Sequence, residues 1–466
     1  MHPIRLTLAL ALVAGAGMAH ARSHGHHPRH RLHGSPGPGQ GELRAALETL
    51  RQGDERLCTL AVDRIDQGGW ERRPRRRLAG ETVPPAVSSE PVKDPAAIAL
   101  LADALADPRA CVRRAAAGWL GNGESPEAST RLLAALHGPD ARSREAAAYG
   151  LGIHAEGAGR DALLGALRDG SAAVVSMAAW ALGRSEDPRN TSALQGVLQH
   201  PDPGARRAAA EALGDSGDPA AVQPLLARRQ DRDATVREVV AEALGSLEDR
   251  RAVPGLLEMA SDGAPEVRSA GFLALAALED SRAFEVARRG LGDPVADVRY
   301  SALQALAALE DPRTLEALTT ALDDPEPAVR AEAAQALGRL EDARAAPALS
   351  RAARDARPEV RVQAVEALGG LEGLGAPPSA LLEASRDAAT DVRVAAAESL
   401  RAFPRDEGAA RQLTALVRDV DREVRRAAAE SLVHLESAAA RAALRAALAD
   451  PDVRVRRAAA RGLGRD

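Results

Sequence analysis

The amino-acid sequence predicts an all-α solenoid, and three observations carry this prediction. From Asp94 onward one pattern recurs about every 31 residues, which indicates a repeat architecture. Only 2% of the 466 residues are aromatic, too few for several independent globular cores, which rely on large rings. The chain is rich in Ala and Leu, and 27% of its residues are charged, as is typical of helices. We therefore expect stacked helices around one continuous core.

Residues 1–21 have the three parts of a secretory signal peptide. Arg5 supplies the positive charge, Leu6 to Met18 form an apolar stretch, and Ala19-His20-Ala21 matches a cleavage site. We exclude this segment from the fold and expect an exported protein, either periplasmic or secreted. The alternative is an uncleaved N-terminal anchor, although an apolar run of about 13 residues is short for a bilayer span. No other apolar run is long enough to suggest a membrane span.

Residues 22–40 are rich in His, Pro and Gly and cannot pack a core, so we expect a disordered tail. Its histidines are His24, His26, His27, His30 and His33. Clustered imidazoles can bind zinc, nickel or copper, but no clustered Cys or carboxylate completes a defined site. We interpret the tail as solvated and predict no resident metal or cofactor.

Residues 41–94 are expected to form an N-terminal cap and a connection. Helical periodicity over residues 41–67 predicts a helical hairpin, and an Arg- and Pro-rich stretch follows it. Arg72, Arg73, Arg75, Arg76 and Arg77 form a basic run within this stretch. We interpret the run as a solvated loop, with binding of an acidic surface as the alternative.

Cys58 and Cys111 are the two cysteines of the chain. Export would place them in an oxidising compartment, which favours a disulfide. A bridge would close a loop of about 54 residues and would stabilise the fold by about 4 kcal/mol on the chain-entropy argument. The alternative is two buried free thiols that act as small apolar side chains.

The repeats align on a Val-Arg step that is followed seven residues later by Leu, often as Leu-Gly. Successive units lie 31 residues apart, except for two intervals of 32. Eleven of twelve units have Arg at the aligned position: Arg113, Arg144, Arg206, Arg237, Arg268, Arg299, Arg330, Arg361, Arg393, Arg425 and Arg456. Val175 stands at the remaining position and interrupts the series.

The unit over residues 311–338 shows how each repeat folds. Pro312 suits a first helical turn, residues 323–327 suit a turn, and Gly338 either begins the helix exit or permits close packing. The apolar faces are Leu315, Leu318 and Leu322 in the first helix and Val329, Ala333 and Leu337 in the second. Two such short helices cannot bury both faces alone, so neighbouring units must stack.

These units resemble HEAT repeats of the short phycobilisome-lyase type over residues 95–466. The resemblance rests on the Leu-x-x-Leu first helix, the turn Asp, the Val-Arg step and the Ala-Leu-Gly end. It implies a right-handed superhelix of about twelve two-helix repeats, in which the turn Asp and the Arg form a ladder between repeats. We therefore interpret the eleven aligned arginines as structural, and expect the turn near Val175 to be less constrained.

The search for chemistry finds no enzyme signature. The sequence has no P-loop, no His-Glu-x-x-His and no Cys-x-x-Cys. HEAT-like hydroxylases are marked by His-Glu pairs, which are absent here, and the resemblance to bilin lyases holds at repeat level only. We predict a non-enzyme; the alternative is a HEAT-like enzyme or accessory subunit of lyase or metal-dependent oxidoreductase type. A formal net charge of −5 argues against a nucleic-acid partner.

The candidate binding residues occupy one position of the second helices, five residues after the aligned Arg. Tyr149 and Trp180 stand there in consecutive repeats, followed by Glu211 and Glu242. This position lies off the Val–Leu stripe, so we expect it to be exposed on the concave face that solenoids use for binding. Tyr and Trp dominate interface energies, and the Glu residues favour a basic or polar partner segment.

The alternative is that the two rings fill gaps left by Gly150, Gly152 and Val175, and that Glu is a default helix former. We expect Trp119, Met177 and Phe272 in the core. The sequence thus predicts a monomeric scaffold or adaptor for a protein partner outside the cytoplasm.

Overall fold

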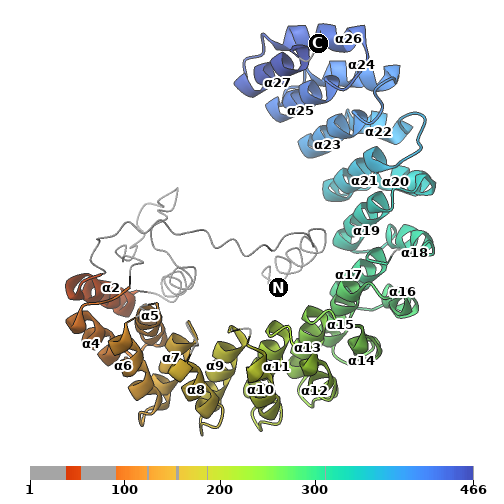
Figure 1. The fold of residues 1–466 in the computed structure, drawn as a ribbon. Coiled ribbons are helices and arrows are strands. Elements are labelled where there is room, and N and C mark those ends of the chain that lie inside the picture. Colours follow the sequence, from red (N-terminus) through yellow and green to blue (C-terminus); the bar gives the residue numbers. More distant parts are fainter. Residues whose placement is uncertain are drawn as a thin grey trace. The chain divides into compact units, whose positions relative to one another are not determined.

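A computed structural model of the chain describes residues 38–53, 91–122, 125–153, 157–185, 187–309 and 311–464. The regular secondary structure within these ranges is helical, which confirms the predicted all-α solenoid (Figure 1). The predicted signal peptide, the tail histidines, the Arg72–Arg77 run and Cys58 lie outside the described residues. Within the described ranges, none of the helices combines the length and the apolar character that crossing a membrane requires.

The chain divides into two compact units, residues 1–252 and 253–466. The helices of the first unit are α2 (Gln40–Gln52), α4 (Pro95–Ala104), α5 (Ala110–Gly121), α6 (Pro126–Leu136), α7 (Ala141–Gly152), α8 (Gly157–Ala166), α9 (Ala172–Gly183), η1 (Pro188–Asn190), α10 (Thr191–Val197), α11 (Pro203–Asp215), η2 (Pro219–Ala221), α12 (Val222–Leu226), α13 (Ala234–Ser246) and η3 (Arg250–Ala252).

The second unit continues the same alternation of a first and a second helix. Its helices are α14 (Val253–Met259), α15 (Pro265–Leu278), η4 (Ser281–Ala283), α16 (Phe284–Gly290), α17 (Ala296–Ala307), α18 (Thr314–Ala321), α19 (Pro327–Arg339), η5 (Ala343–Ala345), α20 (Ala346–Ala352), α21 (Pro358–Gly370), α22 (Ser379–Ala384), α23 (Thr390–Leu400), α24 (Glu407–Leu416), α25 (Arg422–Leu432), α26 (Ala438–Ala447) and α27 (Val453–Leu463).

Within each unit the second helices pack on one another in a continuous row. The row runs from α5 to α13 in the first unit and from α15 to α27 in the second, and it lies on the inner side of each unit's curve (Figure 1). The first helices pack against the second helices from the outer side. Val329, Ala333 and Leu337 of α19 are buried, as the Val–Leu stripe predicts.

Small residues set the close spacing of the second helices. A Cβ atom added at Gly183 would lie 2.7 Å from the Cα atom of Ala212 on the next helix, and Gly214 meets Ala243 at the same distance. Gly338 lies inside α19 and faces Ala367 in the same way, so this glycine permits close packing and does not end the helix. The glycine in the Ala-Leu-Gly end of the repeat therefore allows neighbouring second helices to pack closely.

The arginine ladder joins the turns of successive repeats. Arg206 donates from Nε and Nη2 to both carboxylate oxygens of Asp231, at 2.8 and 2.7 Å. Its Nη1 donates to the carbonyl oxygens of His200 and Pro201 in its own turn, at 2.9 and 3.0 Å. One guanidinium therefore closes the turn between two helices of a repeat and holds the same turn of the next repeat.

The same bidentate arrangement recurs along the described part of the chain. The pairs are Arg144–Asp169, Arg206–Asp231, Arg268–Asp293, Arg299–Asp324, Arg330–Asp355, Arg361–Asp387, Arg393–Asp419 and Arg425–Asp450. The turn Asp also accepts a hydrogen bond from the backbone N–H two residues later, as Asp293 does from Val295. Both partners are largely buried, so each pair acts where solvent screens it little.

Two steps of the ladder in the first unit lack the carboxylate. Gly138 stands where the Asp opposite Arg113 would be, and His200 stands opposite Val175. Arg113 nevertheless keeps the contacts to its own turn, donating to the carbonyl oxygens of Asp107 and Pro108. At the N-terminal side, Arg51 of α2 supplies the cation instead and donates to Asp107 at 2.7 Å. Helix α2 thus takes the place of a preceding repeat.

The ladder carboxylates have pKa values below the ordinary range. Burial of the Asp324 carboxylate opposes its ionisation, but hydrogen bonds from Arg299 and from the backbone N–H of Glu326 outweigh this effect and lower its pKa. The same balance lowers the pKa of Asp231, Asp355 and Asp419.

Adding one methyl group at the helix contact should destabilise the fold. Gly183→Ala places a Cβ against the backbone of Ala212, and we expect a loss of about 1–3 kcal/mol because such overpacking displaces the helices. Gly196→Ala in α10 is the control, since a Cβ there meets no atom within 4 Å and should add up to about 1 kcal/mol. Urea unfolding followed by circular dichroism measures both. Equal effects of the two substitutions would contradict the close-contact explanation.

Acid should weaken the ladder. Because the folded-state pKa of Asp355 is lowered, its stabilising contribution is complete above the unfolded-state pKa of about 3.9 and is lost as the pH falls through the folded value. Arg330→Met removes the guanidinium that donates to Asp355. We expect the variant to lose more stability near pH 7 than near pH 2.5, as measured by urea midpoints. A loss of equal size at both pH values would show that packing, and not the ion pair, is affected.

Candidate functional site

The structure corrects the expectation that both predicted aromatic residues are exposed. Tyr149 of α7 is only 1% exposed, and Trp180 of α9 is half-buried. Their rings stack with centroids 5.4 Å apart and planes at 23°. Gly152 of α7 faces Ala181 of α9, where an added Cβ would lie only 2.5 Å from the Cβ atom of Ala181, and it would lie 3.5 Å from Cζ3 of Trp180, an ordinary contact distance. The burial of Tyr149 favours the alternative of a packing role for this ring over an exposed binding role.

Two arginines complete this stack, and the sequence analysis missed both. The guanidinium carbon of Arg114 from α5 lies 4.9 Å from the ring centroid of Tyr149. That of Arg184, just after α9, lies 5.1 Å from the ring centroid of Trp180. Arg114 directly follows the ladder residue Arg113 and occupies an exposed position. We call Arg114, Tyr149, Trp180 and Arg184 the arginine–aromatic stack.

The predicted acidic positions lie on the surface. Glu211 of α11 and Glu242 of α13 are exposed on the inner row of the first unit. Partial removal from water raises the pKa of Glu211, and the nearby carboxylate of Asp215 adds to the shift. In the second unit Glu366 is exposed, and desolvation and the neighbouring Glu398 raise its pKa in the same way. Each inner row therefore carries carboxylates whose lost hydration is not fully replaced by hydrogen bonds or by opposite charges.

A polar cluster on α17 and α19 of the second unit was also missed. Tyr300 donates to Glu332 at 2.9 Å, and Arg339 donates to the other oxygen of this buried carboxylate at 3.2 Å. Desolvation and the Glu332 charge raise the pKa of Tyr300. Gln304 occupies the same helical position as Tyr149 and Trp180, yet it is buried. Its Oε1 atom has no hydrogen-bond partner among the described residues.

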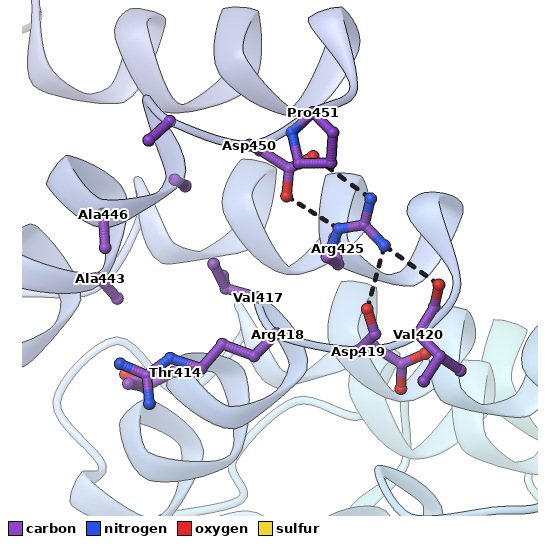
Figure 2. Close-up of a pocket in the computed structure, with 12 residues that line it drawn as sticks. Thr414, Val417, Arg418, Asp419, Val420, Arg425, Ala443, Ala446, Asp450 and Pro451 are labelled. Atoms are coloured by element: carbon purple, nitrogen blue, oxygen red, sulfur yellow. Dashed lines mark hydrogen bonds and ion pairs between the residues drawn. The ribbon is translucent and has the colours of Figure 1, made fainter.

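A shallow pocket in the second unit lies between α24 and α26, beside the last described rung of the ladder (Figure 2). Arg425 lies at its edge and donates to the carboxylate of Asp450 and to the carbonyl oxygens of Asp419 and Val420. Arg418 and Thr414 lie at the opposite side (Figure 2). Its remaining lining is mostly alanine and valine. The polar groups at this edge already serve the ladder, so the pocket offers little chemistry of its own.

The other predicted site residues fall into three groups. Trp119 and Phe272 are buried in the core as expected, whereas Met177 is half-buried. Cys111 lies in the first turn of α5, but Cys58 is outside the described residues, so the disulfide stays a prediction. Among the residues that the structure describes, no group of three or more His, Cys, Asp or Glu side chains is arranged to hold a metal ion.

Comparison with known proteins places this architecture in a family. A family model described as HEAT repeats matches residues 160–245, 224–307, 288–369 and 376–464, which together make up more than half of the chain. No curated protein matches the sequence at a significant level.

Solved structures show the same fold. A structure that describes Kap95p binding to RanGDP matches with a TM-score of 0.59 and 13% identity, over 91% of this chain and 72% of that chain. A structure of importin beta matches with a TM-score of 0.57 and 14% identity, over 91% and 69%. The CpcE–CpcF complex of phycocyanin lyase from Nostoc sp. PCC7120 matches 52% of this chain and 94% of that chain at 24% identity, with a TM-score of 0.32. At 13% and 14% identity the likeness to the first two structures concerns the fold alone, and the TM-score of the third supports no conclusion.

Removing the buried ring of Tyr149 from the arginine–aromatic stack should destabilise the first unit. We expect Tyr149→Ala to cost about 3–5 kcal/mol, because a buried ring is lost and its neighbours cannot fill the space. Tyr149→Phe keeps the ring and should cost much less. Urea unfolding, followed by the fluorescence of tryptophan, measures both. If Tyr149→Ala left stability unchanged, the packing role of Tyr149 would be wrong.

Proposed function

The chain belongs to the HEAT-repeat family, and we propose that it is a non-enzymatic scaffold or adaptor that binds a protein partner along its second helices. The observation that carries this proposal is the row of outward side chains on consecutive second helices. Gln335, Glu366, Glu398 and Glu430 are exposed on α19, α21, α23 and α25 at one and the same helical position. The contacts between repeats do not need these side chains, so the row is open to a partner.

The packing explains why this surface is separate from the fold. Ladder arginines and the Gly–Ala contacts occupy other positions of the second helix and join the repeats. Residues at the outward position can therefore change without loss of the solenoid, and their identities can select a partner. The rival function, an enzyme or an accessory subunit of one, would need reactive groups brought together in addition to this surface.

We also propose that the scaffold works outside the cytoplasm. The support is the arrangement of Arg5, the apolar stretch and Ala19-His20-Ala21 in residues 1–21. Removal of residues 1–21 would leave a mature chain that starts at Arg22.

A photo-crosslinking amino acid at position 398 tests the scaffold. Glu398 is exposed on α23, in the inner row, so we expect this position to crosslink to one protein partner in native cells. Position 415 on α24 is the matched control, since Ala415 is exposed on a first helix. The intact mass of the recovered chain reports whether residues 1–21 have been removed. Equal products at both positions, or none at position 398, would contradict binding along the second helices, and a stoichiometric bound metal would favour an enzyme.

A further inference from the structure

We infer that the arginine–aromatic stack of the first unit binds an extended acidic segment of a protein partner. This inference rests on the proposed function, because it names the chemistry of the partner at one part of the inner row. The stack joins three consecutive second helices: α5 carries Arg114, α7 carries Tyr149 and α9 carries Trp180, with Arg184 one turn further on.

The geometry fixes where the two guanidinium groups lie. The rings of Tyr149 and Trp180 are stacked at 5.4 Å, which leaves no space for a guanidinium between them. Arg114 and Arg184 must therefore cover the two outer faces of the ring pair, at 4.9 and 5.1 Å. A guanidinium stacked on a ring by its flat face keeps its N–H groups at its edge, where they can bind a carboxylate in bidentate fashion.

These two arginines differ from the ladder arginines in having unused donors. Arg144 directs its Nε, Nη1 and Nη2 atoms to Asp169 and to carbonyl oxygens of its own turn. Arg114 and Arg184, in contrast, are exposed and donate to no carboxylate or carbonyl among the described residues. Stacking on the rings restricts both side chains before any ligand arrives, which lowers the entropy lost on binding.

The spacing of the two cations points to the form of the ligand. Their guanidinium carbons are at most about 15 Å apart, since three stacking contacts join them. Four residues of extended chain span about 13 Å, and residues at even spacing lie on the same face of such a chain. Two carboxylates four residues apart can therefore reach both guanidinium groups at once.

The surroundings favour a short acidic peptide segment over a polyanion. Glu211 and Glu242 lie exposed on α11 and α13, the next two second helices of the same unit, and would repel a continuous phosphate backbone. Single-stranded nucleic acid would also need free ring faces for base stacking. Here Arg114 and Arg184 occupy the outer faces and the rings occupy each other's inner faces.

Fluorescence anisotropy with the full chain tests the inference. The probe is a labelled Gly/Ser peptide of about twelve residues with two Glu four residues apart, compared with one that has two adjacent Glu and one that has Lys in place of Glu. We expect the first peptide to bind most tightly. Arg114→Gln and Arg184→Gln should each weaken it by about tenfold, and Arg114→Lys should also weaken it although the charge remains.

Arg207→Gln is the matched control, because Arg207 is exposed on α11 at the helical position of Arg114 and its loss removes the same charge. Unchanged circular dichroism of each variant shows that it is folded. The inference is overturned if Arg207→Gln has the same effect as Arg114→Gln, or if the three peptides bind equally. A partner crosslinked at position 398 together with no binding of the acidic peptide would remove this inference and leave the scaffold proposal standing. Binding of the acidic peptide without a crosslink at position 398 would support the stack as a peptide site and would contradict partner binding along the second helices of the second unit.

Discussion

The bidentate pair between the Arg of one repeat and the turn Asp of the next is the interaction on which the rest of the structure depends. It fixes the distance and the orientation of successive turns, because one rigid guanidinium holds two carbonyl oxygens of its own turn and both oxygens of the next carboxylate, as Arg299 does with Asp324. Once the turns are held in this way, the second helices approach closely where Gly faces a small residue of the next second helix, as at Gly338 and Ala367. The regular period of the sequence is the consequence of these two requirements.

The first unit shows what happens where the ladder is incomplete. The carboxylate is missing opposite Arg113, and both partners are missing at Val175 and His200. The arginine–aromatic stack lies on α5, α7 and α9, the repeats that adjoin these two steps. Contacts between cation and ring, and between rings, add stabilisation of about 0.5–2 kcal/mol each beyond the area that they bury. The stack therefore ties together helices that receive less support from ion pairs than those elsewhere in the chain.

The fold could be predicted from the sequence because its determinants repeat: the Val-Arg step, the turn Asp and the Ala-Leu-Gly end each leave a mark every 31 or 32 residues. The candidate site could be predicted only in part, because exposure at the outward position depends on neighbours that do not repeat. Glu211 is exposed there, but Tyr149 is buried by Trp180 and Arg114, and Gln304 is buried too. One signal was available and was not used: Arg114 lies one residue after the ladder position, on the helix next to that of Tyr149.

The exposed carboxylates along the inner rows carry a free-energy penalty, although the fold does not depend on these side chains. Glu366 and Glu398 stand on neighbouring helices, and the raised pKa of Glu366 shows that its ionised form is disfavoured in the free protein by lost hydration and by the second carboxylate. A donor-bearing partner segment would remove this penalty, which supports the proposal that the row binds a partner. In the first unit the charges also change sign along the row, from Arg114 and Arg184 to Glu211 and Glu242. Such an order favours one direction of a bound extended chain over the other, because the reversed chain would bring like charges together.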